Sequence, residues 1–309
     1  MVKRPFLLIT AILTAVLLGF MCYFVASSRT VQETLKTVVI NDHTPEKAFP
    51  GQDQVNILLM GRDEDRDRHG NVVNSRGRTD AMMLVRVDFA GNTCSILSIP
   101  RDTLVRIPGY RGKRRISYAN ALGGPELAKE TVSEFVGVSP DHHILVNYHG
   151  FEQAIDEMGG LEVNVDKQLD YDDNWGHLHI HLKPGNQVLS GEQAMGFVRY
   201  RKGNDGGGDS DLVRISRQQE VVKALTARLA SPEVMFRVPK LLDMIREDVQ
   251  GDLTTSQIIC LARFAKALPP ESGIRMETVP ALEGGGIYVR ADPDAMSELV
   301  DQMFPRGSH

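Results

Sequence analysis

A long apolar run opens the chain: residues 5–26 read PFLLITAILTAVLLGFMCYFVA, carry no charge and follow Lys3 and Arg4. About twenty such residues are what an α-helix needs to cross a bilayer. We therefore expect a transmembrane helix over residues 5–27, with residues 1–4 in the cytoplasm, because cations precede the span and a long exported chain follows it. The alternative is a cleaved signal peptide, although the apolar region of a signal peptide is normally shorter.

The polar residues after this run are broken by Pro45 and Pro50, so residues 28–54 are expected to form a stalk. Residues 55–304 have the length of one folded body, and residues 305–309 are expected to be a short tail. No shift in composition inside the body marks a second core. The pattern therefore predicts one extracytoplasmic domain.

Within that body, apolar runs with a period of two alternate with amphipathic runs of helical period. We expect strands over residues 55–60, 80–89, 93–99, 142–148 and 161–165, and helices over 125–136, 151–158, 190–197, 211–230, 232–248 and 254–268. The residues Ala90-Gly91-Asn92 predict a hairpin turn, and Asp292 before Pro293 is typical of the start of a last helix. This alternation predicts the α/β class: one three-layer domain with a central mixed β-sheet flanked by helices.

Composition and charge narrow the functions that this fold can have. The 309 residues are 42% hydrophobic and 24% charged, which excludes a disordered or fibrous protein. The formal net charge of -5 gives no general attraction to nucleic acid, so any anion binding must come from a local basic cluster. Cysteines occur only at positions 22, 94 and 260, which indicates no disulfide framework. We expect Cys94 and Cys260 to be free and buried; a bond between them is the alternative.

The helix expected over residues 211–230 breaks its own apolar pattern. Gln218 and Val222 lie on its core line, and the line extends back to Arg214 and Asp211. Polar and charged side chains at positions that should be apolar occur mostly at functional sites. The alternative is that the first two turns project beyond the core into solvent.

Arg199 and Arg201 flank Tyr200, and residues two apart share one face only where the backbone is extended. We therefore expect a strand or strand end that presents both guanidinium groups to one anion. Arg214 follows after a glycine-rich loop and adds a third fork-shaped donor for phosphate oxygens. A solvated basic patch is the alternative.

Asp63 follows the first expected strand and Asp80 starts the second, so the two carboxylates are expected at adjacent strand ends. Carboxylates with open water positions suit Mg²⁺ or Mn²⁺, hard cations that bridge to substrate phosphates. Glu64, Asp65 and Asp67 lie in the same loop, so a solvated acidic loop is the alternative.

His177, His179 and His181 alternate in the sequence HLHIH, a spacing that can present three imidazoles on one face of a strand to zinc. Sequence spacing marks no carboxylate or fourth ligand beside them, so we interpret them as a solvent-facing row. The sequence also contains no nucleophile elbow, P-loop or dinucleotide fingerprint.

Several segments together resemble the LytR-CpsA-Psr family of bacterial cell-wall enzymes. They are NILLMGRD, RTDAMMLV, LSIPRDTLVRIPG, ISYANALGG, NYHGFEQAIDEMGGLEV, IHLKPGNQVLSGEQAMGFVRYR and SDLVRISRQQ, between about residues 55 and 230. The resemblance implies a phosphotransferase, anchored by a single pass in the bacterial cell membrane, that moves a glycan polymer from a polyprenyl-pyrophosphate carrier onto peptidoglycan through a phosphodiester. It also implies an apolar pocket for the membrane lipid between sheet and helices.

The same resemblance implies roles for matching residues. The catalytic set would be Asp63, Arg78, Asp80, Arg101 and Asp211, of which Asp63 and Asp80 would hold Mg²⁺ or Mn²⁺. The residues that bind the pyrophosphate would be Arg101, Arg199, Arg201, Arg214 and Gln218. The family commonly has lysine and asparagine where this chain has Arg115 and Ser117. Asp63 and Asp211 both stay open as the acceptor of the proton from the attacking hydroxyl.

Two other functions use the same residues. A non-catalytic wall protein would retain polyprenyl pyrophosphates or anionic glycans, although the intact Asp63, Asp80 and arginines argue against it. A lipid-pyrophosphate hydrolase would use water as the acceptor. Transcriptional regulation is disfavoured because the chain shows no helix-turn-helix pattern and no basic stripe.

Overall fold

The structure is a computed structural model, and it describes residues 43–62, 65–66, 72–74, 77–173, 178–200, 203–204, 209, 211–229, 234, 249–269, 272–282 and 288–305. The transmembrane span predicted over residues 5–27 lies outside these ranges, as does nearly all of the helix predicted over 232–248. Among the helices that are described, none combines the length and the apolar character needed to cross a bilayer.

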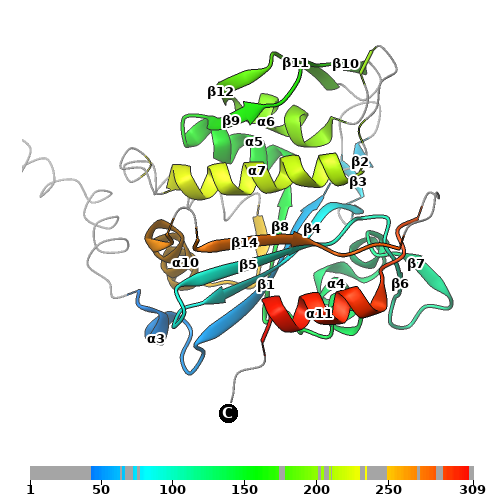
Figure 1. The fold of residues 1–309 in the computed structure, drawn as a ribbon, viewed down its shortest axis with the longest axis vertical. Coiled ribbons are helices and arrows are strands. Elements are labelled where there is room, and N and C mark those ends of the chain that lie inside the picture. The colour runs from blue at the N-terminus through cyan, green and yellow to red at the C-terminus, as the bar shows by residue number, and fades with distance from the viewer. Residues whose placement is uncertain are drawn as a thin grey trace, which may run out of the picture.

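A six-stranded mixed sheet forms the centre of the molecule, in the order β13-β8-β1-β4-β5-β14 (Figure 1). β1 is parallel to β8 and β5 is parallel to β14, whereas the other neighbouring pairs are antiparallel. The predicted hairpin between the second and third strands is confirmed, with Asn92 at a φ of 50° in its turn, a conformation that asparagine tolerates better than most residues. The bounds are β1 Gln54–Arg62, β4 Thr79–Asp88, β5 Thr93–Ser98, β8 His142–Asn147, β13 Val249–Gly251 and β14 Ile274–Thr278.

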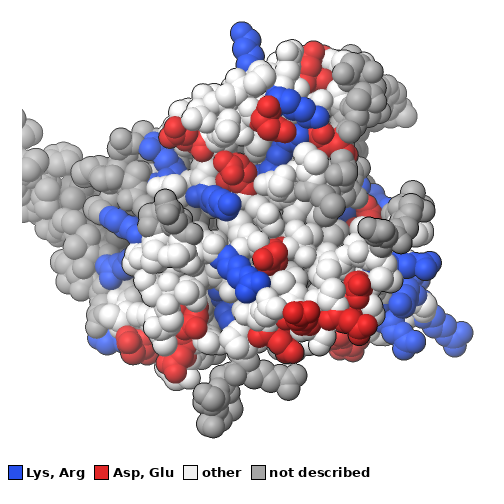
Figure 2. All heavy atoms as spheres, in the orientation of Figure 1, with Lys and Arg blue, Asp and Glu red and all other residues white. Residues whose placement is uncertain are grey.

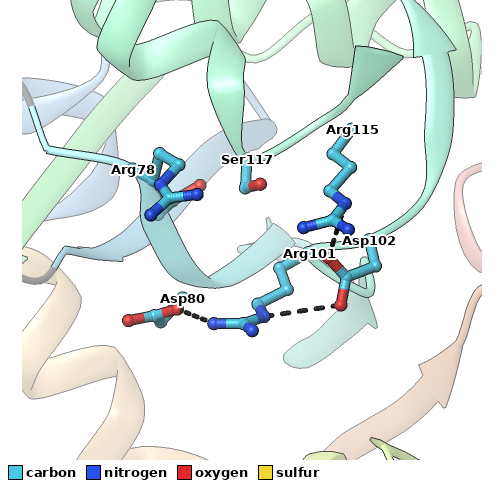
Figure 3. Close-up of a pocket in the computed structure, with 7 residues that line it drawn as sticks. Arg78, Asp80, Arg101, Asp102, Arg115 and Ser117 are labelled. Carbon is cyan, nitrogen blue, oxygen red and sulfur yellow. Dashed lines mark hydrogen bonds and ion pairs between the residues drawn. The ribbon is translucent and has the colours of Figure 1, made fainter. Parts of the chain in front are cut away.

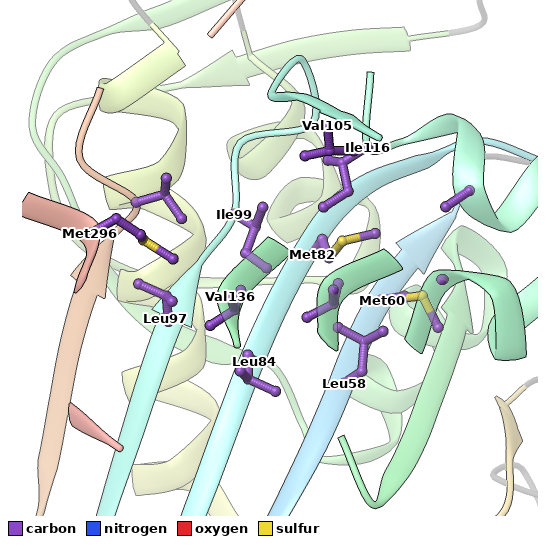
Figure 4. Packing of buried hydrophobic residues seen from close by; sticks show 14 of the residues in the cluster. Leu58, Met60, Met82, Leu84, Leu97, Ile99, Val105, Ile116, Val136 and Met296 are labelled. Carbon is purple, nitrogen blue, oxygen red and sulfur yellow. The ribbon is translucent and has the colours of Figure 1, made fainter. Parts of the chain in front are cut away.

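One face of the sheet packs against α4 (Tyr118–Val136) and α11 (Pro293–Met303). Alternate residues of the strands, among them Leu58, Met82 and Leu97, meet Val136 of α4 and Met296 of α11 in this core (Figure 4). Asp292 caps α11 as predicted. α4 begins at Tyr118, earlier than predicted, because a kink at Gly124, with a φ of 75°, divides it and hides its first turn from the periodic pattern.

The opposite face carries a second layer of helices and short strands, which lies above the sheet in Figure 1. Its core contains residues from α5, α6, α7 and the pairs β9–β12 and β10–β11, and α7 runs along the layer. Sheet and helices on both faces make the predicted three-layer α/β domain. The bounds are α5 Tyr148–Glu157, β9 Leu161–Val165, β10 Leu169–Asp173, β11 Leu178–Leu182, β12 Gly185–Leu189, α6 Gly191–Arg199 and α7 Asp211–Leu229.

One end of this same sheet face is covered by α3 (Pro45–Ala48) and α10 (Thr255–Ala267). Phe49 is buried there against Val55, Val87 and Cys260. The folded body therefore includes residues 45–49 of the predicted stalk. The remaining short strands are β2 Asp65–Arg66, β3 Val72–Asn74, β6 Leu104–Arg106 and β7 Lys113–Arg115.

Both cysteines of the folded body are free and buried, which confirms that prediction. Cys94 lies on β5 and Cys260 on α10, and their surroundings are apolar. Burial raises the pKa of the Cys94 thiol to about 12 and also raises the pKa of Cys260. Neither thiol is placed to act as a nucleophile.

Candidate active site

Two cavities adjoin at the end of the sheet where β4 begins. The smaller one has a volume of about 130 Å³ and is lined by Arg78, Thr79, Asp80, Arg101, Asp102, Arg115 and Ser117. The larger one has a volume of about 700 Å³ and lies between the sheet and the second layer. Asp80 and Arg101 line both cavities, so a charged pair stands where the two spaces meet.

Backbone hydrogen bonds hold the segments of the small cavity together. Thr79, the first residue of β4, donates from its amide to the carbonyl of Ser117 over 3.3 Å. Ser117 in turn donates to the carbonyl of Arg101, also over 3.3 Å. Arg115 is the last residue of β7 and pairs with Leu104 of β6. The start of a strand, the loop after β5 and the entry to α4 therefore converge at one place.

Three guanidinium groups surround the small cavity (Figure 3). Asp102 orients two of them: its carboxylate oxygens lie 3.5 Å from Nε of Arg101 and 3.2 Å from Nε of Arg115. Arg78 lies over the ring of Tyr118, 5.5 Å from the ring centre. Each Nε of Arg101 and Arg115 faces Asp102, so their outer nitrogens point elsewhere, and one of those of Arg101 donates to Asp80.

Asp80 connects this cavity to the helical layer. One carboxylate oxygen accepts a hydrogen bond from Arg101 and the other accepts one from the hydroxyl of Tyr148, the first residue of α5. The guanidinium of Arg199, at the end of α6, lies 4.8 Å from the centre of the Tyr148 ring. A continuous set of polar contacts thus runs from the sheet edge to two helices.

The lining of the large cavity is mostly apolar, with Asn147 and Asp173 as polar exceptions that do not line the small cavity. Residues of β1 and β4 form its floor, and residues of α5, α6, α7 and β10 form its walls. Arg199 and Gln218 add further polar groups to the lining. The apolar lining includes Leu59, Met83, Phe151, Met195, Val198, Val221, Val222 and Leu225.

Basic side chains also gather outside the small cavity, at the edge of the molecule where the β6–β7 hairpin lies (Figure 2). Lys113 and Arg114 are exposed on β7, beside Arg115 of the cavity lining. Arg111, in the turn of the hairpin, is exposed as well. The positive charge of the site therefore continues onto the surface even though the whole chain is negative.

Residues 21–304 match the LytR_cpsA_psr family. The chain belongs to this family. Relatives include Regulatory protein MsrR of Staphylococcus aureus (strain COL), 31% identical over 229 residues that cover 74% of this chain and 64% of the relative. Another relative is the polyisoprenyl-teichoic acid–peptidoglycan teichoic acid transferase TagT of Bacillus subtilis. It is 30% identical over 256 residues, which cover 82% of this chain and 77% of TagT. The chain thus matches less than two thirds of the length of MsrR.

Solved structures of the LytR-CpsA-Psr family share the fold. The crystal structure of B. subtilis TagV superposes with a TM-score of 0.67 at 25% identity, over 83% of this chain and 99% of TagV. TagT bound to LI-WTA superposes with a TM-score of 0.63 at 27% identity, over 82% of this chain and 90% of TagT. The central mixed sheet with helices on both faces is therefore the fold of the family.

The structure brings together five of the residues that the sequence indicated. Arg78, Asp80 and Arg101 line the small cavity, and Arg199 and Gln218 line the large one with Asp80 and Arg101. Arg115 and Ser117, where the family commonly has other residues, line the small cavity too. Asp63, Arg201 and His177 lie outside the described residues, and Asp211 and Arg214 are described only as backbone of the first turns of α7.

The expectation that Arg199 lies on extended backbone is wrong. Ser190 and Gln193 form a capping box that starts α6, and the helix continues through Arg199. Only at Tyr200, with φ at -54° and ψ at 129°, does the backbone leave the helical region. Arg199 therefore reaches the site from a helix end, where its guanidinium stacks on Tyr148.

The apolar line of α7 packs against the core, as its pattern predicted, and also borders the large cavity. Val222 and Leu225 are only partly buried and line the large cavity together with Gln218. Residues that the sequence assigns to a core line thus border an empty apolar space. Gln218 is a polar residue on that line, and it belongs to the lining of the large cavity.

Two residues of the site were not predicted from the sequence. Tyr148 follows β8 directly, so a search of strand ends would have found it beside Asp80. Asp102 is next to Arg101 in the sequence, and its role depends on contacts with Arg101 and Arg115 that only the tertiary structure shows. Outside the two cavities, Arg217 is only 4% exposed, pairs with Asp209 over 2.5 Å and lies 5.2 Å from the centre of the Tyr200 ring, so it joins α7 to the residue that follows α6.

Proposed function

We propose that this chain is a phosphotransferase that moves a phosphate-linked glycan from a polyprenyl-pyrophosphate carrier onto peptidoglycan. One observation carries the proposal: an apolar cavity of about 700 Å³ and an arginine-lined cavity share Asp80 and Arg101. A polyprenyl pyrophosphate has the same two parts, a long apolar chain joined to a diphosphate. The names of TagT, a teichoic acid transferase, and of its complex with LI-WTA support this assignment.

The prenyl chain would occupy the large cavity. Burying apolar surface is worth roughly 25 cal/mol per Å², so a long chain contributes most of the binding free energy without directional contacts. The apolar walls supplied by α5, α6 and α7 suit such a ligand. Because the cavity ends at Asp80 and Arg101, a chain inside it would place its diphosphate at the junction.

The diphosphate would be bound by Arg78, Arg101, Arg115 and Arg199. Guanidinium groups make paired hydrogen bonds to phosphate oxygens and keep their charge at every relevant pH. Asp102 holds Arg101 and Arg115 in place from behind. Arg201 and Arg214 remain proposed members of the same group on the family resemblance.

In the reaction, a sugar hydroxyl of peptidoglycan would attack the phosphorus that bears the glycan. The bond between this phosphorus and the bridging oxygen breaks, and the polyprenyl phosphate leaves with the electron pair. The proton of the hydroxyl passes to a carboxylate, for which Asp63 and Asp211 both remain candidates. Arginines that neutralise the growing negative charge on the leaving phosphate lower the barrier.

The residues of the small cavity also fit a hard cation. Asp80 supplies carboxylate oxygens, and Ser117 adds a hydroxyl. Thr79 is buried, and its hydroxyl has no hydrogen-bond partner among the residues that the structure describes. Oxygen donors of this kind are what Mg²⁺ or Mn²⁺ prefers. We propose that Asp80 and Asp63 hold the ion, which would neutralise charge on the diphosphate when bound.

Membrane anchoring by residues 5–27 would keep the domain on the outer side of the bilayer, where its carrier lipid lies. An anchored enzyme meets a membrane-bound carrier in two dimensions and needs no soluble form of it. The basic β6–β7 hairpin beside the small cavity suits an anionic polymer that extends away from the diphosphate.

The test is a transfer reaction with the full-length protein in lipid nanodiscs, lipid-linked glycan, peptidoglycan and Mg²⁺. We expect glycan bound covalently to the wall, and a loss of about a hundredfold in Asp80→Asn, as for other losses of charge stabilisation in a transition state. Asp301→Asn, which changes an exposed aspartate on α11, is the matched control.

The alternatives give different results in the same reaction. Lipid retained without any transfer would indicate a binding protein, and soluble glycan phosphate without wall attachment would indicate a hydrolase. Undiminished transfer in excess chelator would disprove the role of the metal while leaving the transferase intact.

A further inference from the structure

The β10–β11 hairpin gathers histidine and aspartate side chains on its outer face. The antiparallel register places Asp172 opposite His179 and Asp170 opposite His181. All four side chains are 40% to 58% exposed. The sequence marked the histidines but not the aspartates, because the carboxylates come from the other strand of the hairpin.

Three ligand atoms of this group converge. Oδ1 of Asp172 lies 2.7 Å from Nδ1 of His179 and 3.3 Å from Nε2 of His181. Zinc bonds of about 2.0 to 2.1 Å in tetrahedral geometry separate neighbouring ligand atoms by about 3.3 Å. The distance from Asp172 to His181 already matches this value. The shorter distance from Asp172 to His179 requires that one of these exposed side chains move outward by about half an ångström.

The surrounding contacts orient these ligands as in protein zinc sites. Nδ1 of His181 is 2.6 Å from Oδ1 of Asp170, which leaves Nε2 of the same ring directed at Asp172. Asn204 donates to Oδ2 of Asp172 over 3.2 Å and accepts from the Asp172 amide over 2.9 Å. A carboxylate behind a ligating histidine and a hydrogen bond behind a ligating carboxylate are the typical outer contacts of such sites.

We propose that the outer face of the β10–β11 hairpin binds one Zn²⁺ through Asp172, His179 and His181. The fourth position is left to water. Imidazole nitrogens favour zinc over the magnesium proposed for the oxygen-lined cavity, so the two sites take different metals. The histidine row that we interpreted as merely solvent-facing thus supplies two metal ligands.

Zinc bound to this hairpin would affect the rigidity of one wall of the large cavity. Side chains alternate along β10, so Tyr171 and Asp173 lie on the opposite face from Asp172, and both line the large cavity. A metal that joins the two strands from outside limits their relative motion. The bound ion would therefore stiffen the part of the lipid pocket that the hairpin forms.

A second group, Glu126, His143 and Asp252, also has three ligand atoms close together. There, the ammonium of Lys129 lies 3.6 Å from Glu126 and 3.5 Å from Asp252. The ammonium of Lys129 thus already balances the charge of both carboxylates, and this group is an ion-pair cluster. Among the described residues, the hairpin is the better zinc site.

The test is a titration of the metal-free full-length protein, in nanodiscs, with Zn²⁺ against a chromophoric chelator. We expect one zinc ion per chain and at least a hundredfold weaker binding in His179→Ala and His181→Ala. Asp170→Asn, which removes only the outer contact, should weaken binding about tenfold to a hundredfold. His149→Ala, an exposed histidine outside the hairpin, is the matched control.

Two further readouts identify the site. Saturating Zn²⁺, at about a hundred times its dissociation constant, should raise the melting temperature by about 5 to 10 °C in the wild type and not in His179→Ala. Co²⁺ should give the visible absorption of a tetrahedral ion with nitrogen ligands. Equal zinc affinity in His179→Ala and wild type, loss of zinc only in His143→Ala, or no binding at millimolar Zn²⁺ would each overturn the proposal.

Discussion

The hydroxyl of Tyr148 donates to one carboxylate oxygen of Asp80 while Arg101 donates to the other. The first residue of α5 is thereby joined to the start of β4, across the boundary between the two cavities. The ring of Tyr148 also supports Arg199. One side chain thus positions both the proposed metal ligand and a proposed diphosphate ligand.

Tyr148→Phe separates these two functions because it removes the hydroxyl and keeps the ring. A hydrogen bond to a charged group is worth about 1.5 to 3 kcal/mol, so we expect transfer to fall by about tenfold to a hundredfold. The quantity to measure is kcat/KM for lipid-linked glycan. Tyr110→Phe, at a half-exposed tyrosine outside both cavities, should keep wild-type activity. Equal rates for the two variants would show that the Tyr148 hydroxyl does not position Asp80.

Arg101 and Arg199 should not be replaceable by lysine. A lysine ammonium is a point charge and cannot form the paired hydrogen bonds of a guanidinium, nor stack as well on the Tyr148 ring. We expect about a tenfold to hundredfold loss of transfer in each alanine variant, with only partial recovery in each lysine variant. Lipid-pyrophosphate binding should be measured at low and high salt, with Arg275→Lys, a change at an exposed arginine of β14, as the control.

A diffuse electrostatic role gives the opposite result. Lysine would then match arginine, and the losses in the alanine variants would be small and disappear at high salt. That outcome would leave the arginines as general attractors of anions and remove them from the list of direct diphosphate ligands.

The sequence predicted the parts of this molecule that follow from local periodicity. The β4–β5 hairpin, the cap at Asp292 and the alternation of strands and helices were all evident from residue spacing. What spacing could not show was which side chains from distant segments meet. The pairing of Tyr148 with Asp80 and of Asp172 with His179 depends on the tertiary register.

The error at Arg199 has a similar origin. A spacing of two residues favours an extended strand only when no stronger local signal is present. The capping box of Ser190 and Gln193 starts a helix whose last residue is Arg199. The conformation of Arg199 is therefore set by a helix that starts nine positions earlier, at Ser190, and not by the spacing of the residues next to it.

The buried pair of Asp209 and Arg217 should make stability depend on pH. Burial alone would raise the pKa of Asp209, but hydrogen bonds from Lys167 and Arg217 outweigh it and hold the pKa below its ordinary value. A lowered pKa in the folded state means that the ionised carboxylate stabilises the fold above the pKa of the unfolded chain. This stabilisation is lost as the pH falls through the lowered folded value.

Asp209→Asn removes the close charge partner of the buried Arg217 and leaves only the exposed carboxylate of Asp166, 4.0 Å away, so it should reduce the free energy of unfolding by about 3 to 5 kcal/mol at neutral pH. Urea denaturation of wild type and variant at neutral and acidic pH checks this, because the difference should shrink as the wild-type carboxylate becomes protonated. Lys167→Met removes the exposed partner and should cost only about 0 to 1 kcal/mol. Equal costs for the two variants would contradict a dominant role of Arg217.

The two buried thiols should be unreactive in the folded protein. The pKa of Cys94 is about 12, so at pH 8 almost none of it is thiolate, and burial also limits access by reagents. In a Cys22→Ser background, a thiol reagent should label neither Cys94 nor Cys260 until denaturant is added, after which both should react. Rapid labelling of the native protein would show that the fold opens locally, at β5 or at α10.

The large cavity can be filled from residues that do not line the small cavity. Val198 on α6 and Val222 on α7 both line it, and both are only partly buried, so phenylalanine at either position can extend into open space. Overpacking should therefore not destabilise the fold by the 1 to 3 kcal/mol that is roughly typical of a full core. Val188→Phe, on the exposed side of β12, is the matched control, since Val188 is 63% exposed.

An added ring that excludes about 80 Å² of prenyl surface should weaken binding of the carrier by about 2 kcal/mol, or roughly thirtyfold, at about 25 cal/mol per Å². The effect should depend on chain length, because only long chains reach the deeper walls of the cavity. A long-chain prenyl pyrophosphate should therefore lose affinity for Val198→Phe and Val222→Phe, whereas geranyl pyrophosphate should bind these variants and the Val188→Phe control alike. Equal loss for both ligands would place the added ring against the diphosphate, and no loss for either would mean that the prenyl chain lies elsewhere.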